Sequence, residues 1–166
     1  CYYIGFVYLP EWLSAQGLMD RGGALAINTA MTFLVIPLMP LFAIVGDTWL
    51  PRRTLIAIAM LVLGVAGWPL HEWMLASGGS LASILIAHLV VFSLLAVPLG
   101  SGPALFVEMF PARDRLSGYS VAFNVGLGVI GGLTPLIASS LIAVSGLNMA
   151  PAIYMILAAF GAVVAL

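Results

Sequence analysis

The chain of 166 residues is 63% hydrophobic and only 7% charged, with a mean hydropathy of +1.20 and a formal net charge of −1. A soluble domain is about half apolar and about a quarter charged, so this chain cannot cover itself with a polar surface and belongs in a lipid bilayer. Lysine is absent and Cys1 is the one cysteine, which excludes a nucleic-acid-binding surface, an internal disulfide and a cysteine-based metal cluster.

Long uncharged runs dominate the rest of the sequence, and a spanning helix needs about 20 apolar residues. The predicted spans are 1–10 (partial), 23–46, 54–71, 81–107, 117–144 and 150–166. Glu11 to Gly23 predicts a surface loop with Trp12 as an interface anchor. We expect an all-α polytopic membrane protein, and the short first run and the last run without a polar tail suggest a piece cut at both ends.

The arginines predict the orientation of these spans. If successive loops alternate sides, the loops at 47–53 and 111–116 share one face and carry four arginines, whereas the opposite face has only Arg21. Short cytoplasmic loops are enriched in Arg and Lys. We therefore expect both arginine-bearing loops to lie in the cytoplasm and the protein to be integral to a plasma membrane, the inner membrane of a bacterium.

A glycine-rich segment at 124–132, NVGLGVIGG, fits the G-x-G-x-x-G pattern of dinucleotide-binding proteins. That pattern requires a preceding strand and an acidic residue about 20 positions later, and this uncharged run supplies neither. The spacing instead predicts close helix packing. The residues assigned to packing are Gly128, Gly131, Gly132 and Pro135.

The two histidines lie in different sequence contexts. His71-Glu72 lacks the second histidine of a metalloprotease signature and is interpreted as a solvated loop pair. His88 lies alone within an uncharged span, so it is a candidate for proton titration. The favoured interpretation is a neutral imidazole that is hydrogen-bonded inside the helix bundle, because its span contains no acidic partner.

Polar side chains within the spans are candidates for the lining of a substrate cavity. Asn28 and Thr32 are one helical turn apart, as are Ser120 and Asn124, so each pair shares a helix face. Such side chains either hold helices together or face a wet pathway. We assign Asn28, Thr32 and Asn124 to the lining.

Charged residues flank the cytoplasmic ends of the predicted spans. Glu108 precedes the helix-breaking Pro111 closely, and a partly buried carboxylate needs a nearby cation. Arg115 and the arginines of the 47–53 loop are the available partners. The sequence therefore predicts a charge clasp that joins the helix ends. Its members are Asp47, Arg52, Arg53, Glu108, Arg113 and Arg115.

At these residues the chain resembles the metabolite:proton symporter group of the major facilitator superfamily, which includes proline/betaine, α-ketoglutarate, shikimate and citrate carriers. Glu108, Phe110, Pro111 and Arg115 fill the group's E-x-F-P-x-x-x-R element, and residues 131–135 fill its GG-x-x-P element. The 47–53 loop resembles the superfamily's D-R-x-G-R-R loop, although Thr48 replaces the first arginine and one extra residue precedes the arginine pair.

The resemblance implies the C-terminal half of a 12-helix carrier, from the end of helix 7 to helix 12, which would pair with a six-helix N-terminal half. It also implies alternating access around a midplane site, with the clasp closing the cytoplasmic side. The expected function is proton-coupled symport of an organic acid or osmolyte, with no enzyme activity, cofactor or metal. The rivals are a sugar or drug facilitator of the same superfamily, a membrane-embedded enzyme and an inert structural membrane module.

Overall fold

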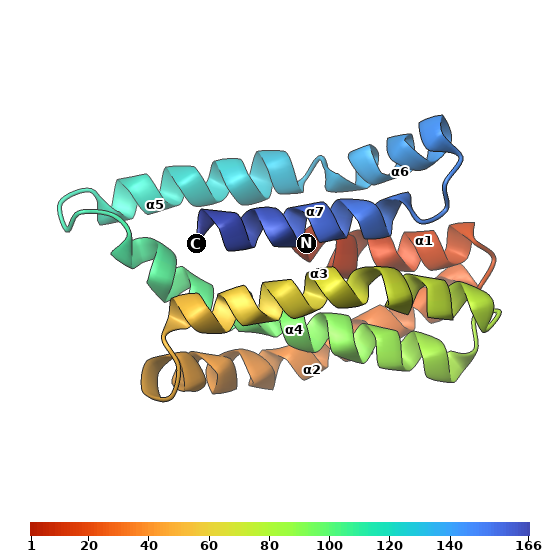
Figure 1. Ribbon diagram of the computed structural model, residues 1–166, viewed down its shortest axis with the longest axis horizontal. Coiled ribbons are helices and arrows are strands. Elements are labelled where there is room, and N and C mark those ends of the chain that lie inside the picture. Colours follow the sequence, from red (N-terminus) through yellow and green to blue (C-terminus); the bar gives the residue numbers. More distant parts are fainter.

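The computed structural model describes residues 1–166 and consists of helices joined by short turns, with no strand (Figure 1). The elements are η1 (Ile4–Tyr8), α1 (Leu9–Ala15), α2 (Arg21–Thr48), α3 (Arg52–Ala76), α4 (Leu81–Glu108), α5 (Arg115–Phe123), η2 (Asn124–Gly131), α6 (Thr134–Ser145) and α7 (Ala150–Ala165). Both η elements are π-helical.

Four helical units are long and apolar enough to cross a membrane. They are α2, α3, α4 and the continuous stretch Arg115–Ser145, which comprises α5, η2 and α6. The expected all-α membrane fold is therefore confirmed. In α4, half of the most apolar window is buried, against 11% in α2; most of the α2 surface consequently faces outward from these helices.

The prediction of a loop from Glu11 to Gly23 is wrong in its first part. The first helix continues through α1 to Ala15, and Trp12 is 1% exposed instead of lying at an interface. Its indole Nε1 donates a hydrogen bond to the backbone carbonyl of Asn148, 2.9 Å away. The true turn is short, because the carboxylate of Asp20 accepts from the amide of Gly23 and begins α2.

The interpretation of His71-Glu72 as a solvated loop pair is also wrong. α3 continues through Pro69 to Ala76, and His71 is buried, with its Nδ1 2.8 Å from the carbonyl of Gly67. Glu72 is exposed and accepts from the indole of Trp68 at 2.8 Å. A proline within a membrane helix is tolerated where neighbouring groups satisfy the freed carbonyls, so the helix continues past Pro69.

α4 is the centre of the bundle and packs against α2, α3 and η1. At its crossing with α2, a Cβ on Gly100 would clash with the backbone carbonyl of Met39, so only glycine allows the two backbones to approach this closely. The hydroxyl of the adjacent Ser101 donates to the carbonyl of Phe42 at 2.9 Å. By contrast, α5 and η2 contain no buried residue.

The turns gather at two opposite ends of the bundle (Figure 1). One end carries the α2–α3 and α4–α5 turns, and the other carries the turns around 16–20, 77–80 and 146–149. The first end is the one that contains Asp47, Arg52 and Glu108.

Candidate functional site: a charged junction and a polar bundle interior

The charged junction begins with the tight turn between α2 and α3. α2 ends at Thr48 and α3 begins at Arg52, immediately after Pro51. This geometry brings the guanidinium of Arg52 onto the carboxylate of Asp47, with Nε and Nη2 each 2.7 Å from the same Oδ1. Two donors on one oxygen fix the orientation of the guanidinium.

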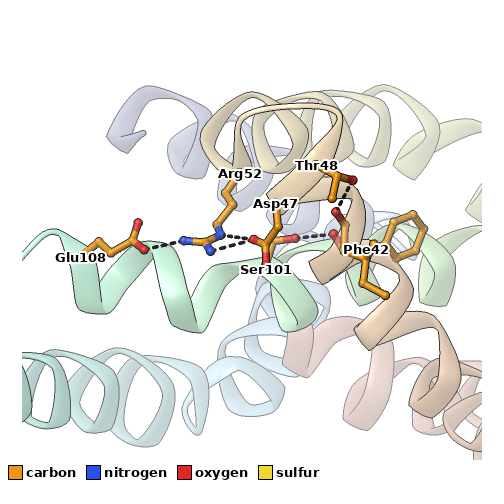
Figure 2. A network of polar contacts seen from close by, with 7 residues as sticks. Phe42, Asp47, Thr48, Arg52, Ser101 and Glu108 are labelled. Atoms are coloured by element: carbon orange, nitrogen blue, oxygen red, sulfur yellow. Dashed lines mark hydrogen bonds and ion pairs between the residues drawn. The ribbon is translucent and has the colours of Figure 1, made fainter.

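The same guanidinium reaches the end of α4. Its Nη1 lies 2.6 Å from Oε1 of Glu108, so a single arginine joins the ends of α2, α3 and α4 (Figure 2). The arginine side chain is 25% exposed, whereas the carboxylates of Asp47 and Glu108 are 51% and 57% exposed. Water therefore reaches the pairs, and each contributes modestly to stability.

Close packing between α2 and α4 also supports this junction. A Cβ on Gly46 would lie 3.0 Å from Ser101 Oγ and 3.1 Å from Arg52 Cγ. The absence of a side chain at Gly46 therefore leaves space for the side chain of Arg52 beside α4. Sequence reasoning missed Gly46, Gly100 and Ser101, although the run Gly100-Ser101-Gly102 in an apolar helix is a signal for close helix contact.

The remaining predicted clasp residues do not join the ion-pair network. Glu108 pairs with Arg52 and not with Arg115, whose Nε donates to the carbonyl of Phe110 at 3.2 Å. Arg53 and Arg113 are exposed and form no ion pair with any carboxylate of this chain.

The E-x-F-P-x-x-x-R element has a structural role that its residues make clear. α4 ends at Glu108, and Phe110 folds its ring over the start of α5, where a Cβ on Gly118 would lie 2.5 Å from Phe110 Cδ1. Arg115 closes the turn from the other side through the Phe110 carbonyl. The element therefore shapes the α4–α5 turn and leaves Glu108 free to accept from Arg52.

The predicted lining residues are in two separate places. The amide nitrogen Nδ2 of Asn28 donates to the carbonyl of Phe6 in η1 at 3.1 Å, and its Oδ1 is buried without a partner. Thr32 is exposed and donates to the carbonyl of Asn28 at 2.8 Å. Asn124 is exposed at the start of η2 and bonds within its own helix, to the carbonyl of Ser120.

Both histidines lie inside the bundle. His88 is fully buried on α4, with Nδ1 2.9 Å from the carbonyl of Ile84. Because this nitrogen faces an acceptor, it carries the proton, and Nε2 presents a buried lone pair without a partner. The His71 ring lies edge-on to the Trp12 indole, with centroids 5.0 Å apart. This ring contact ties α1 to α3 near the end of the bundle opposite the charged junction.

The glycines assigned to helix packing contact less than expected. A Cβ on Gly128 would meet nothing within 4 Å, whereas one on Gly131 would lie 2.6 Å from the ring of Tyr3. Gly132 faces the carbonyl of Gly128 in its own π-helical segment, and Pro135 begins α6. Of the three glycines, only Gly131 would bring an added Cβ close to another helix of this chain.

An apolar cavity of about 500 Å³ lies next to the junction end. Among its lining residues are Met60 of α3, Phe106 of α4, Tyr119 of α5 and Ala162 of α7. Its walls are almost entirely hydrophobic, so it has none of the convergent polar groups that orient a polar substrate. No three His, Cys, Asp or Glu side chains of the chain converge into a metal-binding group.

Comparison with known proteins finds transporters. The chain is 28% identical over 151 residues to the ectoine/proline transporter ProP of Corynebacterium glutamicum, covering 89% of the chain and 29% of that protein. It is 27% identical to the citrate-proton symporter of Klebsiella pneumoniae, with 95% and 35% covered. It is 26% identical to a Staphylococcus aureus protein assigned as a proline/betaine transporter, with 92% and 32% covered.

The relatives are an ectoine/proline transporter, a citrate-proton symporter and a proline/betaine transporter, which confirms the resemblance to the metabolite:proton symporter group seen in the motifs. The chain spans about a third of the length of the curated relatives that it matches. No protein-family model matches the chain. No solved structure matches it.

Proposed function

We propose that this homologue of the major facilitator symporters is part of a secondary active transporter that carries a small polar or charged metabolite together with protons. The similarity to ectoine/proline and citrate-proton transporters over most of the chain supports this proposal. The substrate would be an organic acid or an osmolyte. The observation that carries the transport mechanism is the junction in which Arg52 joins three helix ends.

In this mechanism two six-helix halves rock around a site near the bilayer midplane. These helices form most of the C-terminal half, and a six-helix N-terminal half completes the transporter. The ion pairs of Arg52 with Asp47 and Glu108 hold the junction end closed while the carrier is open to the outside. They separate when it opens inward, so their strength biases a two-state equilibrium.

The junction end faces the cytoplasm in this proposal, and the membrane is the inner membrane of a bacterium. Four of the five arginines lie at this end, in accord with the enrichment of positive charge in cytoplasmic loops.

No acidic side chain lies in the middle of a helix here, so we place the main proton-carrying residue in the other half. His88 is the one titratable side chain in the interior of α4, since Glu108 lies at its last position. The chain acts in transport and has no enzymatic role.

The test is uptake by the complete transporter, meaning the full-length protein to which these helices belong, in proteoliposomes. An inward-directed proton gradient should drive accumulation of radiolabelled glycine betaine, proline or citrate. A protonophore should abolish that accumulation. Uptake that proceeds equally with and without the gradient would contradict proton coupling, and absence of uptake for all three compounds would contradict the substrate class.

A further inference from the structure

The first residues of the chain form an aromatic cluster. Tyr2 lies edge-on to Tyr3, with centroids 5.3 Å apart and ring planes at 86°, and it stacks on Phe6 at 4.8 Å. Phe6 in turn contacts Phe92 of α4 at 4.2 Å. Phe92 is fully buried and forms the back wall, whereas the rings of Tyr2, Tyr3 and Phe6 are only partly buried.

A buried polar atom without a partner belongs to the same region. Asn28 Nδ2 donates to the carbonyl of Phe6, and this bond fixes which end of the amide is the oxygen. The remaining Oδ1 is shielded from solvent and accepts no hydrogen bond within the chain. An unsatisfied buried acceptor costs about 1–3 kcal/mol, so a donor from outside these helices would gain from binding to this oxygen.

The backbone around the cluster is irregular. η1 is a π-helical segment that contains Phe6, and the second π-helical segment, η2, contributes Gly131 against the ring of Tyr3. π-helical turns inside membrane helices occur frequently at functional sites. Two of them meet at this cluster.

The cluster lies near the middle of the expected membrane thickness. At about 1.5 Å per residue, Phe6 is roughly 13 Å from the helix end at Ala15, Asn28 is roughly 10 Å from the start of α2, and Phe92 is roughly 16 Å from the start of α4. All three distances run from the same end of the bundle, and the hydrocarbon core is about 30 Å thick. Figure 1 likewise shows the N-terminus midway along the bundle.

We propose that Tyr2, Tyr3, Phe6 and Asn28 form one side of a binding site for the ammonium group of the transported substrate. The faces of aromatic rings attract cations, including quaternary ammonium groups. The Asn28 oxygen accepts a hydrogen bond where the ammonium nitrogen carries a proton. No carboxylate lies at this depth in the bundle, so ring faces and an amide oxygen are the groups present that favour a cation. This inference rests on the proposed transport function and narrows its substrate class to ammonium-bearing zwitterions.

Binding to the complete transporter in detergent tests the site without requiring transport. Radiolabelled glycine betaine should bind, and tetramethylammonium should displace it, whereas citrate, which has no ammonium group, should not. Tyr2→Leu should weaken betaine binding about tenfold, and Tyr2→Phe, which keeps the ring, should stay within about twofold. Asn28→Leu should weaken binding of proline, which has N–H donors, more than binding of betaine, which has none.

Tyr119→Leu is the matched control, since Tyr119 also pairs with an aromatic side chain, Phe123, at 5.3 Å but lies at the other end of the bundle. Equal binding by Tyr2→Leu and wild type, equal losses in Tyr2→Leu and Tyr119→Leu, or no displacement by tetramethylammonium would each overturn the ammonium site. Proton-driven citrate uptake without betaine binding would overturn the site and leave the transport proposal standing. Betaine binding without proton-driven uptake would support the site and contradict the transport proposal.

Discussion

Arg52 donates to two carboxylates that belong to different helices, so one side chain determines how α2, α3 and α4 meet. Arg53 is its direct neighbour, has the same charge and forms no ion pair. The difference comes from direction, because on a helix adjacent residues point about 100° apart and only Arg52 faces α4. Several arginines lie at this end of the bundle, but only Arg52 links helices to one another through ion pairs.

Removing the Arg52 charge should favour the form of the carrier that is open at the junction end. For Arg52→Gln we expect this population to rise roughly fivefold, because two water-exposed pairs of modest strength are lost. Glu108→Gln should have a smaller effect in the same direction, since Asp47 still holds the guanidinium. The measurement is the labelling rate of a cysteine at Thr32, in a Cys1→Ser background, by a charged maleimide added from the junction side.

Arg53→Gln serves as the control for this experiment, since it removes the same charge from the same turn without breaking an ion pair. Its labelling rate should match that of the parent protein. If Arg52→Gln and Arg53→Gln accelerated labelling equally, net charge and not the clasp would control opening.

Among the elements, α4 organises the bundle, and its contact with α2 depends on the absence of side chains at two points. Gly100 lies against the Met39 carbonyl, and Gly46 lies against Ser101 and Arg52. In lipid, helices gain little from burying apolar surface against each other, so close backbone approach and interhelical hydrogen bonds such as that from Ser101 to Phe42 hold them together. α2 and α4 should consequently move as one body.

Gly100→Ala should destabilise this pair by about 1–3 kcal/mol, because the added methyl group forces the α2 backbone away. Gly161→Ala is the control, as a Cβ there would meet nothing within 4 Å and alanine favours a helix. Thermal unfolding of the complete transporter in detergent should show a lower midpoint for Gly100→Ala and an unchanged or higher one for Gly161→Ala. Equal midpoints would mean that the α2–α4 approach is looser than described.

At the scale of the whole molecule, the turns lie at two opposite ends of the bundle (Figure 1), and seven of the eleven charged residues lie at the end with the Arg52 junction. The ion pair between Arg21 and Glu11, 3.4 Å apart, lies at the second end and is exposed on both sides. The large outward-facing surface of α2 and the absence of buried residues in α5 and η2 leave room for contacts with lipid and with the N-terminal half of the proposed transporter.

The two ends should be labelled from opposite sides of the membrane. In a Cys1→Ser background, a membrane-impermeant maleimide should modify Ala112→Cys in inside-out vesicles and Gln16→Cys in right-side-out vesicles. Ala112 is exposed and Gln16 is partly exposed in the turn after α1, so neither position is buried and the side of the membrane decides the outcome. The reverse pattern would invert the proposed orientation, and labelling of both positions from one side would contradict the alternation of the turns.

The sequence alone was sufficient for some features because they depend on local composition. Runs of uncharged residues predicted helices in a membrane, and E-x-F-P-x-x-x-R indicated a resemblance to the major facilitator superfamily. Prediction from the sequence failed for residues whose contact partner is distant in the chain. The local sequence predicts an interface position for Trp12 and a loop position for His71, because nothing nearby indicates that Trp12 reaches the carbonyl of Asn148 or that His71 lies against Trp12.

Composition is sufficient to predict that the chain lies in lipid and that it is helical. A chain with 7% charge must enter lipid, and in lipid the backbone must satisfy its own hydrogen bonds as helices. Only the tertiary structure decided which charges pair and which polar atoms stay unsatisfied. It selected Arg52 over Arg115 for Glu108, and it brought Asn28 to Phe6 beside the aromatic rings. Those outcomes depend on the rotation and crossing of helices, which glycine contacts and interhelical bonds set and composition does not encode.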